Sequence, residues 1–184
     1  EASTTVLVEK ENNVWVLQVS AALTAFQQEI NMHFSETPYK TPEEFQQMVL
    51  EHLKKHLQIQ FNGDQNVILK NGMVQLGHET KVVFEVVGVP QEILTAQITN
   101  SAFEDIHRSK SSVLLLKKDF KRNKFILNES NNYSVALHVS NREFVETTVD
   151  EASMFSSLSV YMLIGLGSLL GLGLLYRRFV PSSL

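Results

Sequence analysis

Residues 154–176 form an apolar run that contains no charged side chain, and this run limits the architecture of the chain more than any other feature. Crossing the hydrocarbon core of a bilayer takes about 20 mostly apolar helical residues. A helix in a soluble core would carry a polar stripe every three to four residues, whereas mainly serines interrupt this run. We therefore predict a single transmembrane helix within residues 151–178, in preference to a buried core helix or a removed anchor signal.

Charges on the two sides of the run predict its orientation. Arg177 and Arg178 follow the run, and Asp150 and Glu151 precede it. Because cationic residues are retained on the cytoplasmic side, we expect residues 1–150 outside the cytoplasm and residues 179–184 as a short cytoplasmic tail. The chain opens at Glu1, which suits a protein whose secretory signal peptide has been removed. The expected location is the bacterial inner membrane, with the first domain in the periplasm.

Composition narrows the class of the first 150 residues, which are enough for one domain with its own core. The chain has no cysteine, which excludes disulfides, thiolate metal sites and cysteine nucleophiles and favours a periplasmic domain over a small eukaryotic cell-surface module. The net charge of -4 argues against a nucleic acid partner.

Short β-branched and aromatic runs, separated by turn residues, predict a mainly β domain. The strand-like runs cover residues 4–10, 14–23, 57–61, 67–70, 74–78, 81–87, 93–99, 113–118, 124–128 and 133–139. Glycine, asparagine or proline mark turns at residues 62–64, 71–72 and 88–90. The spacing is typical of an antiparallel β-sandwich or meander with one packed helix, an α+β arrangement.

One helix has a clear start. The Thr41 hydroxyl is placed to cap it, Pro42 takes the first helical position, and Glu44 completes a capping box. One face then carries an apolar stripe of Phe45, Met48, Val49, Leu53 and Leu57. Residues 24–34 fit either a continued strand or a short helix. Residues 140–153 are polar and fit an ordered extension of the anchor helix rather than a tether.

Three motifs in the middle of the chain carry a resemblance. They are HLQIQFNGD at residues 56–64, QITNSAFEDIH at 97–107 and SSVLLLKKDFKRNKFILN at 111–128. With the capped helix before them, they make residues 39–139 resemble an uncharacterised exported domain family of Bacteroidota. A related pattern is similar to the extracytoplasmic N-terminal domain of nickel permeases of the hydrogenase and urease accessory type. The resemblance implies a periplasmic, mostly β domain of unknown activity.

Two histidines are candidate metal ligands. His52 and His56 stand four residues apart on the predicted helix, so their imidazoles share a face and offer two ligands to one divalent metal. A closed site needs more ligands, which convergence of His33, His78, His107 or His138 would supply. The alternative is that both histidines border the apolar stripe as surface residues.

Two further features suggest contacts with partners. A basic cluster at an expected hairpin tip offers a surface for anionic lipid headgroups or an acidic partner, the alternative being a solvated turn; its residues include Lys117, Lys118, Lys121, Arg122 and Lys124. In the anchor, small residues expose backbone for close helix packing, although glycine is also simply frequent in membrane helices; these residues are Gly165, Gly167, Gly171 and Gly173.

No catalytic or cofactor-binding motif is evident: the chain has no nucleophile elbow and no phosphate-cradling glycine loop. We therefore expect no enzymatic activity and no cofactor. The favoured function is an accessory subunit or assembly factor, held in the inner membrane by one helix that docks against an integral membrane complex or a copy of itself. The alternative is a metal- or ligand-binding periplasmic domain that serves a transporter.

Overall fold

The computed structural model describes residues 3–34 and 39–147. The chain divides into two compact units, Glu1–Glu146 and Thr147–Leu184, and the described residues fall almost wholly in the first. No helix of the described part has both the length and the apolar character that crossing a membrane requires. The run at 154–176 and its glycines lie outside the described residues, so the transmembrane helix stays a prediction.

The first unit is mainly β, which confirms the class that the strand and turn signals predict. Its α-helices are α1 (Leu23–His33) and α2 (Pro42–His56), and two short 3-10 helices cover Glu11–Asn13 and Glu129–Asn131. Its strands are β1 (Ser3–Glu9), β2 (Trp15–Ala22), β3 (Leu57–Phe61), β4 (Gln65–Asn66), β5 (Ile68–Gln75), β6 (Glu79–Val87), β7 (Thr95–Asn100), β8 (Ser111–Leu116), β9 (Lys124–Leu127), β10 (Ser134–Ser140) and β11 (Glu143–Glu146).

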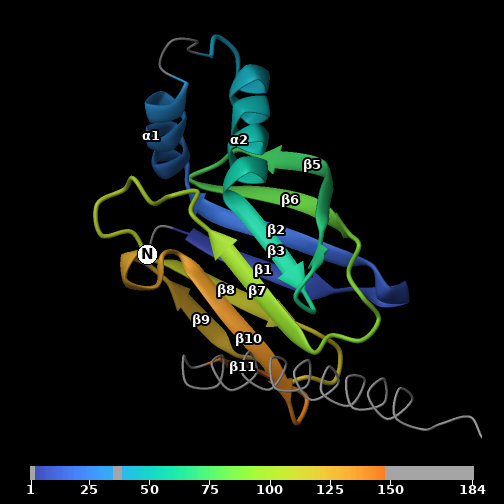
Figure 1. Ribbon diagram of the computed structural model, residues 1–184. Coiled ribbons are helices and arrows are strands. Elements are labelled where there is room, and N and C mark those ends of the chain that lie inside the picture. The colour runs from blue at the N-terminus through green and yellow to red at the C-terminus, as the bar shows by residue number, and fades with distance from the viewer. Residues whose placement is uncertain (1–2, 35–38, 148–184) are drawn as a thin grey trace, which may run out of the picture. The chain divides into compact units, whose positions relative to one another are not determined.

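The strands form two sheets, one in front of the other in Figure 1, with the orders β5-β6-β2-β1-β8-β9 and β11-β10-β7-β3-β4. Most neighbouring strands are antiparallel, but β1 runs parallel to β8, with Leu7 opposite Leu115. The expectation of an antiparallel arrangement is therefore wrong for this pair. Local periodicity shows that a segment is a strand and gives no information about a partner so distant in sequence.

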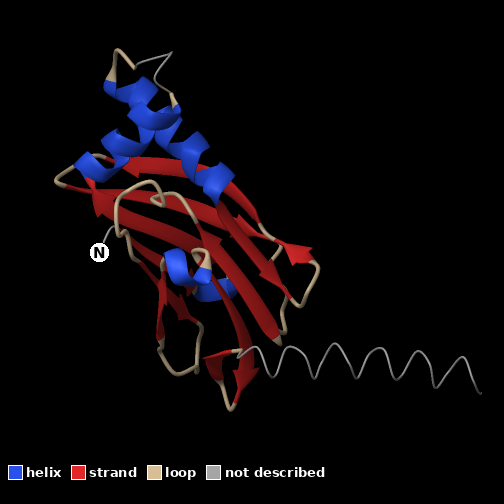
Figure 2. Ribbon diagram, turned by 60° about the vertical axis from the view of Figure 1, so that its left-hand side comes forward, coloured by secondary structure: helices blue, strands red, loops and turns tan. Residues whose placement is uncertain are grey.

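The core lies between the two sheets, because alternate residues of each strand turn inward. In the larger sheet Leu17 of β2 and Phe84 of β6 have no exposed surface, and in the smaller sheet Ile59 of β3 and Ile98 of β7 are buried. The intervening residues of these strands are less buried or exposed. Figure 2 shows the two helices side by side at one end of the sheets.

Helix α2 begins as the sequence predicts. The Thr41 hydroxyl accepts a hydrogen bond from the Glu44 backbone N–H at 3.2 Å. The Glu44 carboxylate accepts one from the N–H of Lys40, a residue earlier than in a standard capping box. Residues 24–34, which fit either a strand or a helix, form most of helix α1. Phe26 and Ile30 are buried one turn apart on its inner face.

Two local predictions are wrong. Residues 71–72 do not end a strand, because β5 continues through them with a bulge between Lys70 and Met73. Residues 143–146 do not extend an anchor helix but form β11, which pairs with β10 and buries Phe144. In addition, Leu57, assigned to the helix stripe, is the first residue of β3.

Candidate metal centre

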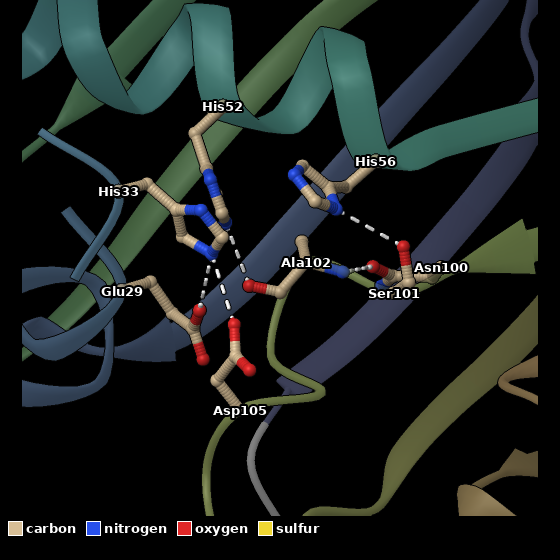
Figure 3. Close-up of polar contacts among 8 residues, drawn as sticks. All are labelled: Glu29, His33, His52, His56, Asn100, Ser101, Ala102 and Asp105. Carbon is tan, nitrogen blue, oxygen red and sulfur yellow. Dashed lines mark hydrogen bonds and ion pairs between the residues drawn. The ribbon is translucent and has the colours of Figure 1, made fainter.

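Three histidines from the two helices converge on one point. His33 lies at the end of α1, and His52 and His56 lie on successive turns of α2. Their ring centroids are 4.5 Å apart for His52 and His56, 5.1 Å for His33 and His52, and 5.4 Å for His33 and His56. Figure 3 shows the His33 ring beside the rings of His52 and His56, which extend from α2. One ring nitrogen from each residue lies within 4.8 Å of the others.

Each imidazole has one nitrogen in contact with a different acceptor (Figure 3). His52 Nε2 is 2.7 Å from the Ala102 carbonyl oxygen, and because a carbonyl only accepts, this nitrogen carries the proton. His33 Nε2 is 2.9 Å from the Asp105 carboxylate. His56 Nδ1 is 3.1 Å from the Ser101 hydroxyl, and its Nε2 is buried with no hydrogen-bond partner among residues 3–34 and 39–147. This pattern leaves a lone pair on Nδ1 of His33 and on Nδ1 of His52. In the tautomer in which His56 Nδ1 donates to the Ser101 hydroxyl, Nε2 of His56 also has a lone pair.

Burial disfavours the protonated form of both histidines of α2. Burial lowers the pKa of His52 to about 4; the nearby His56, His33 and Lys55 lower it further, against the hydrogen bond to Ala102. Burial also lowers the pKa of His56, with His33 and Lys55 acting in the same direction. Neutral imidazole is the form that binds a metal ion.

The carboxylates of Glu29 and Asp105 both lie next to Nε2 of His33. Glu29, one turn earlier on α1, is only 1% exposed, and its Oε2 is 3.6 Å from His33 Nε2. Neither Glu29 oxygen has a hydrogen bond within the described part of the chain. Burial, then the charges of Asp105 and Glu104, raise the pKa of Glu29 to about 7. Glu29, His33 and Asp105 form a second group whose ligand atoms lie within 4.8 Å of one another.

The β7–β8 connection supplies the acceptors for the histidines, and the core holds its first residues in place. The Ala102 backbone N–H donates to the Asn100 side-chain oxygen at 3.1 Å. The Phe103 ring packs edge-on against Phe26 of α1, with centroids 5.1 Å apart. The outer contacts of the cluster are therefore fixed by packing between a loop and a helix distant in sequence.

The structure brings His52 and His56 together as their spacing indicates, and His33 joins them. The alternative that both border the apolar stripe at the surface is wrong for His52, which is 2% exposed. Within the described part of the chain, His78, His107 and His138 belong to neither group.

Sequence reasoning missed the carboxylates Glu29 and Asp105. The available signal was the helical spacing of Phe26 and Ile30, which puts Glu29 and His33 near the same face of α1.

The basic cluster lies on and beside the β8–β9 connection, and carboxylates pair with part of it. Lys117 Nζ is 3.2 Å from Glu9, and Lys121 Nζ is 2.9 Å from Glu143. Lys118 and Arg122 line a hollow of about 880 Å³ beside the β1–β2 turn, together with Lys117. Lys124 is the first residue of β9. Docking of this cluster on lipid or an acidic partner stays a prediction.

No protein-family model matches the chain, and no curated protein matches it.

Proposed function

We propose that this domain binds one divalent transition-metal ion through His33, His52 and His56. The observation that carries the proposal is that each imidazole uses one ring nitrogen to contact a protein oxygen, which belongs to a carboxylate, a carbonyl or a hydroxyl. We propose that the other ring nitrogen binds the metal. Metal-binding histidines generally have such an outer partner, which fixes the ring and its tautomer.

The donor set indicates the class of metal. Imidazole nitrogen suits zinc, nickel and copper(II), and the chain has no cysteine to favour softer ions. In a tetrahedral zinc site with bonds of about 2.0 Å, ligand nitrogens are about 3.3 Å apart. One ring nitrogen from each histidine lies within 4.8 Å of the others, so the side chains would have to rotate to bring three nitrogens to this spacing.

The test is calorimetry on the untagged full-length chain, stripped of metal and titrated with zinc, nickel or copper(II). We expect one ion per chain, with affinity falling at least a hundredfold in His52→Gln and in His56→Gln. The matched control is His78→Gln, because His78 is exposed and lies outside the cluster. Absence of binding at micromolar protein, or equal affinity in all three variants, would end the proposal.

Membrane attachment is a separate proposal, supported by the apolar run at 154–176. In this view the chain is a single-pass protein of the bacterial inner membrane, and its metal-binding domain faces the periplasm. The helix would contact an integral membrane complex or a second copy of the chain through its glycines. An accessory role for a larger complex and metal binding by the domain are compatible.

A further inference from the structure

We infer that the metal of the proposed centre keeps a fourth coordination position that opens into a small pocket and takes water or a small monovalent anion, with Lys55 at its rim attracting the anion. This inference rests on the proposed function. It adds the class of ligand that the centre accepts from solution.

The three proposed histidine ligands line the pocket, but the carboxylates of Glu29 and Asp105 do not. His33, His52 and His56 all line it, together with Phe34, Glu51 and Lys55. Glu29 and Asp105 are not part of its wall, and both contact His33 through Nε2, the nitrogen assigned to the outer contacts. The carboxylates therefore do not fill the side of the histidine cluster that faces the pocket.

Among the described residues, no further protein ligand stands at the open side. Glu51 is the pocket's one carboxylate, and it does not belong to the group whose ligand atoms lie within 4.8 Å of one another. Three protein ligands with one open position is the arrangement of zinc sites that exchange a ligand, whereas structural zinc sites are closed by four. Because the described residues offer no fourth side chain there, we assign the fourth position to a ligand from solution.

The size of the pocket limits that ligand. Its volume is about 140 Å³. A water molecule in the liquid takes about 30 Å³, so the space suits a few waters or one small ion. Pockets for drug-sized organic ligands begin at about 300 Å³. We therefore assign the position to water and to anions of the size of azide or formate.

The pocket wall carries both signs of charge, the carboxylate of Glu51 and the ammonium of Lys55, so the charge of the bound metal ion decides which ligand is favoured. Lys55 lines the same pocket as His52 and His56, so its positive charge lies beside the proposed open position. Three neutral imidazoles leave the charge of a divalent ion uncompensated at the open position. Lys54, the preceding residue, points elsewhere: its ammonium lies 6.0 Å from the centre of the Phe84 ring.

Cobalt(II) is the probe, because its visible absorption reports coordination, which zinc does not. The full-length chain is loaded with one equivalent of cobalt and titrated with sodium azide at constant ionic strength, with sodium perchlorate as the non-coordinating control. We expect a saturable change in the cobalt bands with azide and none with perchlorate. Lys55→Met should weaken azide binding about twofold to fivefold, the range for an exposed charge pair, and Lys54→Met should not.

The outcomes separate the two proposals. If wild-type protein develops no cobalt bands, or if His52→Gln develops the same bands, the proposed function fails. If the bands form but azide leaves them unchanged, the metal is bound in a closed site and the open position is refuted. If azide binds equally well to Lys55→Met and to wild type, the role of Lys55 is refuted.

Discussion

The side chain of Asn100 donates a hydrogen bond from Nδ2 to Oγ1 of Thr5 at 3.0 Å, and so joins β7 of one sheet to β1 of the other. Both residues are buried. The Asn100 oxygen accepts from the Ala102 N–H, and the Ala102 carbonyl accepts from His52 Nε2. Three hydrogen bonds, through Asn100 and Ala102, thus link buried Thr5 of β1 to a proposed metal ligand, His52.

We predict that Asn100→Ala lowers the free energy of unfolding by about 2 to 4 kcal/mol, because it leaves the Thr5 hydroxyl and the Ala102 N–H buried without partners. Metal affinity should fall about tenfold to a hundredfold in the same variant, the range for disturbed outer contacts. Urea denaturation and calorimetry measure the two effects. Gln97→Ala, at an exposed position of the same strand, is the control, and an equal loss in both variants would contradict the prediction.

Stability of the metal-free domain should fall in acid because of His52. Its pKa is about 4 in the folded state and 6.5 in the unfolded state, so the unfolded chain takes up the proton first as the pH falls. The stabilising effect is fully present above pH 6.5 and is lost as the pH falls to 4, at about 1.4 kcal/mol per pH unit, or on the order of 3 kcal/mol in total. Urea unfolding with a chelator present, from pH 7.5 to pH 4, should show a shallower loss in His52→Gln than in His78→Gln.

Glu29 should make the domain more stable at acid pH than at alkaline pH, which is the opposite of the effect of His52. Its pKa is raised from 4.5 to about 7 on folding, so the folded state holds the proton more tightly. This stabilising effect is complete below pH 4.5 and is lost as the pH rises through 7, which costs on the order of 3 kcal/mol by pH 8. Glu29→Gln should therefore be more stable than wild type at pH 8 and lose that advantage at pH 5. Glu51→Gln, on the exposed side of α2, should show no such crossing.

Gly72 in β5 should not tolerate alanine. A Cβ atom at this position would lie 2.6 Å from Leu50 Cδ2 of α2 and 2.7 Å from Cε1 of the Phe84 ring. The Phe84 side chain has no exposed surface, so the ring cannot turn into solvent without losing its burial. We expect Gly72→Ala to cost about 1 to 3 kcal/mol, the range for an overpacked core, when measured by urea denaturation. Met73→Ala is the neighbouring control, since Met73 is 69% exposed.

The glycines of the apolar run should hold the chain to its membrane partner. Gly167→Ile together with Gly171→Ile adds bulk where close backbone approach is proposed, so a partner that co-purifies in mild detergent should be lost. The control is Leu169→Ile together with Leu170→Ile, which keeps the helix apolar without filling the glycine face. Unchanged co-purification of the partner with the glycine variant would count against helix packing.

The sequence predicts the elements of this fold better than their pairing. Thr41, Pro42 and Glu44 mark the start of α2 correctly because capping depends only on residues close in sequence. Asn71 and Gly72 resemble a turn, but here the positive φ of Asn71 sits at a bulge and Gly72 makes room for α2. Strand β11 is short and polar, and Phe144 is its one buried residue.

In the candidate site, too, the local features are predictable from the sequence and the tertiary contacts are not. The spacing of His52 and His56 indicates their shared face, because it is a property of one helix. The position of His33 beside His52 depends on how α1 packs against α2. The contacts of the imidazoles with Ala102 and Asp105 depend on where the β7–β8 connection lies. These are tertiary relationships, which a local pattern in one sequence does not contain.

The parallel pairing of β1 with β8 has a consequence for biosynthesis. Ser3 pairs with Ser111, so one edge of β1 has no partner until the ribosome has made most of the domain. Contacts between such distant segments slow folding, and an unpaired strand edge invites association with other chains in the meantime. A chaperone that shields β1 during synthesis should therefore raise the yield of native protein more than one that acts after release.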